Sequence, residues 1–156
     1  MMKHQQGVYS VEFALVGTVF FITLFSVLEV GRLFFTWNVL AEASRRTARL
    51  AVVCDLDRDA MQPHADMLAA AAFDNQPLVP NLSAANLKIQ YLNFDGSQAS
   101  KFSEIRLVRA EIINYSFDLL IPGLSIQLNS PSFSATLPRE SLGVTRYGYT
   151  QCQATA

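Results

Sequence analysis

Few side chains in this sequence are of the types that perform chemistry. The two histidines are His4, near the start, and His64, which stands beside Asp66 in no pattern typical of a catalytic base. The sequence contains no nucleophile elbow, zinc-protease motif or phosphate-binding loop. The residues therefore indicate a protein that is not an enzyme, with no catalytic residue and no cofactor.

The potential metal ligands are also few. Asp55, Asp57 and Asp59 alternate as they do at the start of a calcium loop, but the glycine and the distal glutamate of that loop are missing. Two histidines and two cysteines would form a zinc site only if nearly all of them converged. We expect an acidic turn here and no metal site.

The composition favours a membrane protein. Of the 156 residues, 51% are hydrophobic and only 16% are charged, which is more apolar than a soluble domain usually is. Twelve Lys and Arg against 13 Asp and Glu give a net charge of -1, so no basic field is present to attract a nucleic acid. The length fits one domain.

One segment is long and apolar enough to cross a bilayer. The run Phe13–Leu28 is uncharged but about four residues short of the roughly 20 that a span needs, so we expect the span to cover residues 8–30. It would then include Glu12, a carboxylate that must lie at headgroup depth or find a cationic partner. Lys3 favours a cytoplasmic N-terminus, with the larger C-terminal part translocated.

Helical periodicity continues beyond the span. Glu29 and Arg32 are three residues apart, share a helix face, and are expected to form an ion pair at the membrane exit. An apolar stripe follows at helical spacing, formed by Leu33, Trp37, Leu40, Ala41, Ser44, Ala48, Ala51 and Val52. The pattern predicts one helix over residues 8–53, whose amphipathic part, residues 31–53, packs on a sheet.

The remaining residues, 54–156, alternate between helical and strand patterns. A short helix is expected from Pro63, in its first turn, to Phe73, followed by a loop over Asp74–Asn81. Strands are expected over residues 87–92, 105–117, 125–128 and 132–137, the second being long enough to bend and closed by Pro122-Gly123. We expect an α+β fold in which the long N-terminal helix, transmembrane in one half and amphipathic in the other, packs on a small antiparallel meander.

The start of the span resembles a known processing motif. Residues 7–13, GVYSVEF, are similar to the prepilin cleavage motif of type IVb pilins and pseudopilins. The following residues, VEFALVGTVFFITLFSVLEVGRLFF and NVLAEASRRTARLAV, resemble the N-terminal helix of the TadE/TadF-like minor pseudopilins of tight-adherence (Flp) pili. Near the C-terminus, SFSATLPRESLGV is similar to the closing strand and Arg-Glu turn of those proteins.

The resemblance implies a pilin-like fold and a role in assembling a type IVb pilus. Residues 1–7 would be a leader that a prepilin peptidase removes after Gly7, so that Val8 becomes the N-terminus. Glu12, followed by Phe13, would pair with the Val8 amine of a neighbouring subunit. The implied partners are the peptidase, other pilins and pseudopilins of the same pilus, an inner-membrane assembly platform and membrane lipid. Residues 54–156 would form a periplasmic domain, and the chain would stay in the inner membrane or enter the pilus.

Three other interpretations of the residues remain open. The first is an uncleaved signal anchor carrying a periplasmic binding module, and the second is a membrane-tethered enzyme. The third is a secreted domain cleaved at the A-x-A pattern of Ala41–Ala43, although that pattern stands about a dozen positions beyond the apolar run and such sites follow closely.

Cys54 and Cys152 both fall in the part assigned to the periplasm. Oxidising conditions there allow a disulfide between them. Two free thiols are the alternative, because the sequence does not place the two Cα atoms within bonding reach.

Overall fold

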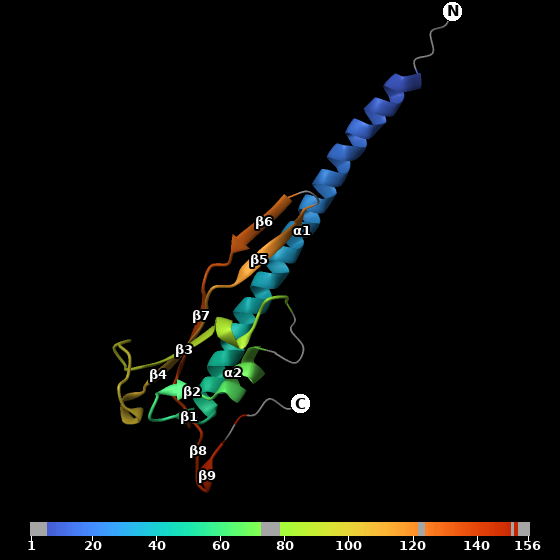
Figure 1. The fold of residues 1–156 in the computed structure, drawn as a ribbon. Helices are drawn as coiled ribbons and strands as arrows, with labels where there is room; N and C mark the ends of the chain where they lie inside the picture. The colour runs from blue at the N-terminus through green and yellow to red at the C-terminus, as the bar shows by residue number, and fades with distance from the viewer. Residues whose placement is uncertain (1–5, 73–78, 122–123, 151, 153–156) are drawn as a thin grey trace, which may run out of the picture.

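The computed structural model describes residues 6–72, 79–121, 124–150 and 152. One helix dominates it: α1 (Gln6–Val53) has 48 residues and is about 72 Å long at 1.5 Å per residue. The N-terminal half of α1 projects beyond the other elements, which gather along its C-terminal half (Figure 1). The expected α+β fold, a long N-terminal apolar helix packed on small antiparallel sheets, is confirmed.

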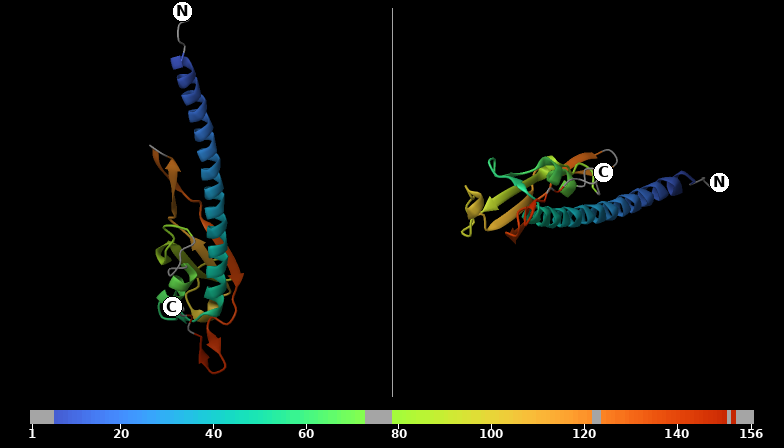
Figure 2. Two further views of the ribbon diagram at one scale, coloured as in Figure 1. Left: turned by 90° about the vertical axis from the view of Figure 1, so that its right-hand side faces the viewer. Right: turned by 90° about the horizontal axis from the view of Figure 1, so that it is seen from below.

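A three-stranded antiparallel sheet is the main partner of α1. Its strands are β3 (Leu87–Leu92), β4 (Leu107–Ile112) and β7 (Phe133–Pro138), in the order β3-β4-β7. Alternate residues of the central strand, Val108, Ala110 and Ile112, are buried, as expected for a strand with one face on a core. The sheet lies to one side of the helix (Figure 2).

The C-terminal half of the helix buries small residues among the elements that pack on it. Ala43, Ala48 and Ala51 are fully buried, which lets the helix backbone approach the strands closely. Every residue of the apolar stripe expected from the sequence is buried or partly buried. Trp37 is among them and packs against the core.

A separate two-stranded ribbon lies beside the middle of α1. It consists of β5 (Ser116–Ile121) and β6 (Leu124–Asn129) and runs along the helix toward its projecting half (Figures 1 and 2). The predicted continuous strand over residues 105–117 is therefore wrong, as is the meander. Asn114 has φ of 54° between β4 and β5, a left-handed conformation that Asn tolerates and that redirects the chain out of the first sheet.

Shorter elements close the fold. They are β1 (Leu56–Asp57), β2 (Gln62–Pro63), α2 (Ala65–Ala72), the 3-10 turns η1 (Ala84–Asn86) and η2 (Phe102–Glu104), β8 (Val144–Thr145) and β9 (Gly148–Tyr149). The short helix was predicted to include Pro63 in its first turn. That prediction is wrong, because Pro63 pairs with Leu56 in the β1–β2 hairpin.

Several sequence predictions fall on residues outside the described ranges. These residues are most of the leader, Phe73, the first part of the 74–81 loop, and the Pro122-Gly123 turn.

Candidate functional site

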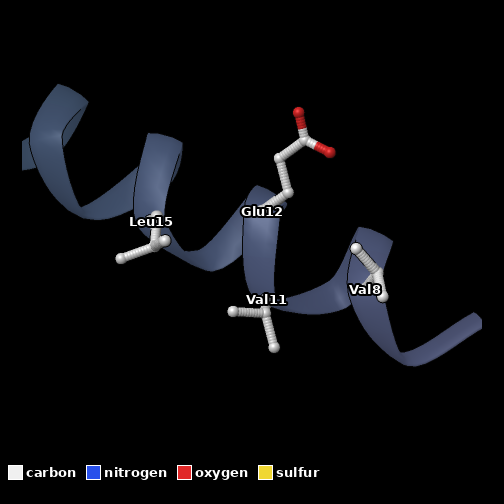
Figure 3. Close-up of a pocket in the computed structure, with 4 residues that line it drawn as sticks. All are labelled: Val8, Val11, Glu12 and Leu15. Atoms are coloured by element: carbon white, nitrogen blue, oxygen red, sulfur yellow. The ribbon is translucent and has the colours of Figure 1, made fainter.

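The residues of the processing motif lie in the first turns of α1. Gly7 and Val8 are in its first turn, and Glu12 and Phe13 follow one turn later. Figure 3 shows the Glu12 carboxylate extending away from the helix, with Val8, Val11 and Leu15 around the same turns. Glu12 has no hydrogen-bond or ion-pair partner among the described residues. Phe13 is 79% exposed, so this end of α1 is an uncovered apolar surface that carries one carboxylate.

The segment that follows is exposed around its whole circumference. Its most apolar 18-residue window has a mean hydropathy of 2.2 and none of it is buried. The polar side chains of this segment form hydrogen bonds within the helix. The hydroxyls of Thr18, Thr23 and Ser26 donate to the carbonyls four residues earlier, at 2.7–2.8 Å. Such a helix, long, apolar and without a covering layer, fits a single-pass membrane anchor.

The two charges at the far end of the apolar segment meet each other. Arg32 Nη2 donates to Glu29 Oε2 at 2.9 Å. Glu29 is only 8% exposed, although it stands on an otherwise open stretch of helix, because the β5–β6 ribbon covers this face.

The ion pair is also the point where the ribbon is fastened to the helix. Glu29 Oε2 accepts the backbone N–H of Leu120 at 3.3 Å, and Arg32 Nη2 donates to the backbone carbonyl of Asp118. The Arg32 guanidinium also lies 4.3 Å from the centroid of the buried Phe117 ring, a cation–π distance. These contacts occupy the free backbone edge of β5, which would otherwise be an unpaired strand edge.

The C-terminal end of α1 is closed by the C-terminal segment of the fold. The last carbonyls of a helix have no partner within it. Here the backbone N–H of Leu142 donates to Val52 O at 2.9 Å and that of Gly143 to Val53 O at 2.8 Å. The Asp55 N–H donates to Thr150 O at 3.0 Å, so residues 142–150 cap the helix and the turn behind it.

Cys54 and Cys152 are joined in a disulfide, with their Cα atoms 5.5 Å apart. The same end of the fold carries a cation between two rings: the Arg58 guanidinium lies 4.1 Å from the Tyr149 ring centroid and 4.6 Å from that of Phe102. Covalent, hydrogen-bond and cation–π contacts thus hold the C-terminal segment against the residues that follow α1.

Two of the three carboxylates in the acidic turn after α1 contact groups of the same turn. Asp55 lies 3.6 Å from Arg58, and Asp57 Oδ1 accepts the N–H groups of Ala60 and Asp59 at 3.0 Å each. These two N–H groups hold the pKa of Asp57 below its usual value. Among the described residues, no group of three or more His, Cys, Asp or Glu side chains is arranged to hold a metal ion.

Sequence reasoning missed the residues that contact the middle of α1 and those that close its C-terminal end. Phe117, Asp118 and Leu120 contact residues about 90 positions earlier in the chain, and no local pattern indicates such a pairing. Leu142 and Gly143 have a weak signal, since a glycine often takes the left-handed conformation that Gly143 has. The stretch SFSATLPRESLGV contains both residues, so part of that stretch closes the helix.

The fold and the exposed helix define a class: a small α+β domain carried on one apolar helix that fits a membrane anchor. Residues 7–49 match the family model described as TadE-like protein, which confirms the resemblance of this segment to TadE/TadF-like proteins. The match covers most of α1 and nothing after Arg49. The TadE-like family is a family of structural, pilus-associated proteins, and the likeness of this chain to it is confined to residues 7–49. No curated protein and no solved structure matches the chain.

Proposed function

We propose that this chain is a minor pseudopilin that takes part in assembling or initiating a Tad (Flp) type IVb pilus, the structure used in adhesion and biofilm formation. The observation that carries the proposal is the GVYSVEF motif at the start of an uncovered apolar helix, within the residues that match the TadE-like family. A prepilin peptidase would cut after Gly7, and the protein would act as its substrate, not as an enzyme.

The position of Gly7 suits a processing site. Gly weakens a helix by about 1 kcal/mol relative to Ala, and the first turn of a helix has no preceding turn to support it. The Gly7–Val8 bond therefore lies where α1 unwinds at little cost, as a peptidase requires.

Glu12 is the proposed assembly residue. A carboxylate in the middle of a bilayer costs about 2.5–3.5 kcal/mol and less near the interface, so an uncompensated Glu12 favours a cationic partner. Cleavage after Gly7 would create such a cation, the Val8 amine. Glu12 has no partner among the described residues of its own chain, which leaves it available to the Val8 amine of a neighbouring subunit, with Phe13 packing beside it.

The proposed topology follows from this function. Residues 1–7 form the leader, residues 8–30 the transmembrane helix, residues 31–53 its amphipathic continuation, and residues 54–156 a periplasmic domain. The N-terminus lies in the cytoplasm and the anchor in the inner membrane, where the peptidase, the assembly platform and the other pilins meet it. The disulfide between Cys54 and Cys152 is compatible with an oxidising periplasm.

The first experiment determines the N-terminus of the full chain extracted from membranes, by intact mass and terminal sequencing, in cells with and without prepilin peptidase. We expect a start at Val8 that depends on the peptidase and is lost in Gly7→Ala. Gly17→Ala, a change at an open position on the same helix, is the matched control and should be processed normally. A start at Met1 or Met2 in all cells would contradict the proposal and favour an uncleaved anchor with a binding module.

The second experiment tests Glu12 in piliated cells. Glu12→Ala and Glu12→Gln are expected to reach the membrane at normal levels and to be cleaved, yet to be absent from the purified pilus or its base. Glu42→Ala, which removes an exposed carboxylate from the amphipathic half of α1, serves as the control and should behave as the parent chain does. Normal incorporation of both Glu12 variants would mean that assembly does not require a pairing contact of the Glu12 carboxylate.

A further inference from the structure

The uncharged run of α1 is shorter than the bilayer core, so the core must also include the charged residues that flank this run on one side. The uncharged run Phe13–Leu28 is about 24 Å long at 1.5 Å per residue, whereas the hydrocarbon core is about 30 Å thick. The missing length corresponds to about four residues. These are Tyr9–Glu12 on one side or Glu29–Arg32 on the other.

The two ends differ in how their charges are compensated. Glu12 is exposed and has no partner among the described residues. Glu29 is 8% exposed, lies 2.9 Å from Arg32 Nη2 and accepts the Leu120 N–H. A charged side chain that is already paired and hydrogen-bonded loses less solvation free energy on entering hydrocarbon than an unpaired one does. The bilayer therefore favours the position that leaves Glu12 among the headgroups and takes in the Glu29–Arg32 pair.

The helix surface at the level of this pair is apolar wherever the ribbon does not cover it. The exposed side chains there are Val27, Leu28, Val30, Phe34 and Phe35. The next exposed polar side chain along α1 is Asn38. The apolar surface thus continues past the ion pair by more than one helical turn.

The ribbon lies at the same level and carries an exposed apolar side chain on each of its two faces, because Ile126 pairs with Leu119, the neighbour of Leu120 along β5. Leu120, whose N–H binds Glu29, is 68% exposed, and Ile126 on β6 is 42% exposed. Asp118, two residues before Leu120 on β5, accepts a hydrogen bond from Gln127 at 3.0 Å, so the polar part of the ribbon begins about 7 Å from Leu120.

We propose that the β5–β6 ribbon is a second membrane-contacting element, whose Leu120 and Ile126 side chains lie against lipid beside the exit of α1. The occupant is lipid because the ribbon's apolar side chains adjoin the exposed apolar surface of a helix whose uncharged run is too short for the bilayer. The proposal moves the span from residues 8–30 toward Phe13–Arg32. It rests on α1 crossing a bilayer, but not on cleavage after Gly7 or on pilus assembly.

The test uses the full chain in liposomes whose acyl chains carry bromine, which quenches tryptophan fluorescence on contact. The parent variant is Trp37→Phe, which removes the single native tryptophan. Leu120→Trp and Ile126→Trp are then the two probes on the ribbon. Phe21→Trp, in the middle of the span, is the reference for full quenching. Phe94→Trp, at an 86% exposed position in the loop that follows β3, is the control for water. Circular dichroism selects the variants that fold.

We expect brominated lipid to lower the emission of both ribbon probes by at least half of the loss seen for Phe21→Trp, as for side chains at interfacial depth, and to leave Phe94→Trp unchanged. Ribbon probes that are as insensitive to bromine as Phe94→Trp would overturn the proposal. Blue-shifted but unquenched ribbon probes would also overturn it, because a second copy of the chain or another protein would then cover the ribbon.

The lipid contact of the ribbon and the pseudopilin function are tested independently, so either can be refuted without the other. The intact mass of the same preparation shows whether Gly7 was cleaved, and the bromine experiment is valid for the cleaved and the uncleaved chain alike.

Discussion

Gly143 is the residue whose side chain the fold restricts most sharply. Its φ is 77°, and a Cβ added there would lie 2.3 Å from the Asp55 Cα, a backbone atom that cannot move aside cheaply. Its N–H also closes the end of α1 through the Val53 carbonyl. A single position therefore combines a left-handed backbone, a close approach and a helix cap.

Gly143→Ala is accordingly expected to lower the free energy of unfolding by about 2–4 kcal/mol, measured by chemical unfolding in detergent. The matched control is Gly96→Ala, which has φ of 85° but open space around its Cβ position. It should cost only the left-handed penalty of about 1–2 kcal/mol. Equal losses of unfolding free energy in the two variants would show that the close approach to Asp55 adds no cost to the left-handed conformation.

Asp57 gives the acidic turn a pH dependence. The N–H groups of Ala60 and Asp59 lower the pKa of its carboxyl from 3.8, so the ionised form is favoured in the folded chain. The contribution of Asp57 to stability is present above the unfolded value and is lost as the pH falls through the lower folded value.

We therefore expect Asp57→Ala to be less stable than the parent at neutral pH and the difference to shrink below about pH 3.8. Thermal unfolding of both proteins over an acid pH series measures this difference. Asp59→Ala, at the neighbouring exposed position, is the control and should follow the parent curve. A gap that stays constant with pH would exclude the carboxylate as its cause.

At the scale of elements, the β5–β6 ribbon depends on α1 for its position. Its β5 edge is bound through Glu29 and Arg32, whereas β3, β4 and β7 pair with one another. Two strands alone are marginally stable in water. The ribbon should therefore open more readily than the three-stranded sheet.

Arg32→Ala removes the hydrogen bond to Asp118 and the contact with the Phe117 ring. Hydrogen bonds to charged groups contribute about 1.5–3 kcal/mol when buried, and the Arg32 side chain is 32% exposed, so we expect a loss of about 1–2 kcal/mol in the ribbon. Hydrogen exchange at the Leu120 amide should accelerate about tenfold, with β4 amides unchanged.

The control for this variant is Arg45→Ala, which breaks an exposed i,i+3 pair with Glu42 and should leave both elements unchanged. Exchange that accelerates equally in β4 and β5 would mean that the ribbon and the sheet open as one unit.

At the scale of the whole molecule, the disulfide links positions 98 residues apart. Closing a loop of that length stabilises the folded chain by about 4–5 kcal/mol in the chain-entropy model. Cys54→Ser combined with Cys152→Ser is expected to lower the Tm measured by circular dichroism, while the helix and strand signal at low temperature persists. Backbone hydrogen bonds from Leu142, Gly143 and Asp55 hold the same segments together. An unchanged Tm would show that these bonds suffice.

The sequence predicted what local periodicity encodes. A run of apolar residues at 3.6-residue spacing identified α1 and its buried stripe, and alternation identified β3, β6 and β7 within a residue or two. It failed where a single residue takes an uncommon backbone conformation and where another segment supplies a pairing partner. Asn114 breaks a continuous strand pattern through its φ alone, and Pro63 entered a hairpin because Leu56 was there to pair with it.

The candidate site divides in the same way. Gly7, Glu12 and the Glu29–Arg32 pair are visible because they stand at fixed spacings within one helix. The partners of that pair on β5 are invisible, since strand pairing and helix docking bring them together only in three dimensions. The role of Arg32 as the fastening point of the ribbon could thus not be anticipated from its spacing to Glu29.

The hydrogen bonds that close the C-terminal end of α1 also set an order of events during synthesis. Leu142 and Gly143 leave the ribosome about 90 residues after Val52 and Val53, whose carbonyls they bind. At about 5–20 residues per second, the open helix end waits roughly 5–20 seconds for its partners. α1 is therefore completed only after β3 to β7 have been synthesised, and a chain that stops before Leu142 exposes the end of α1 however well the intervening strands have paired.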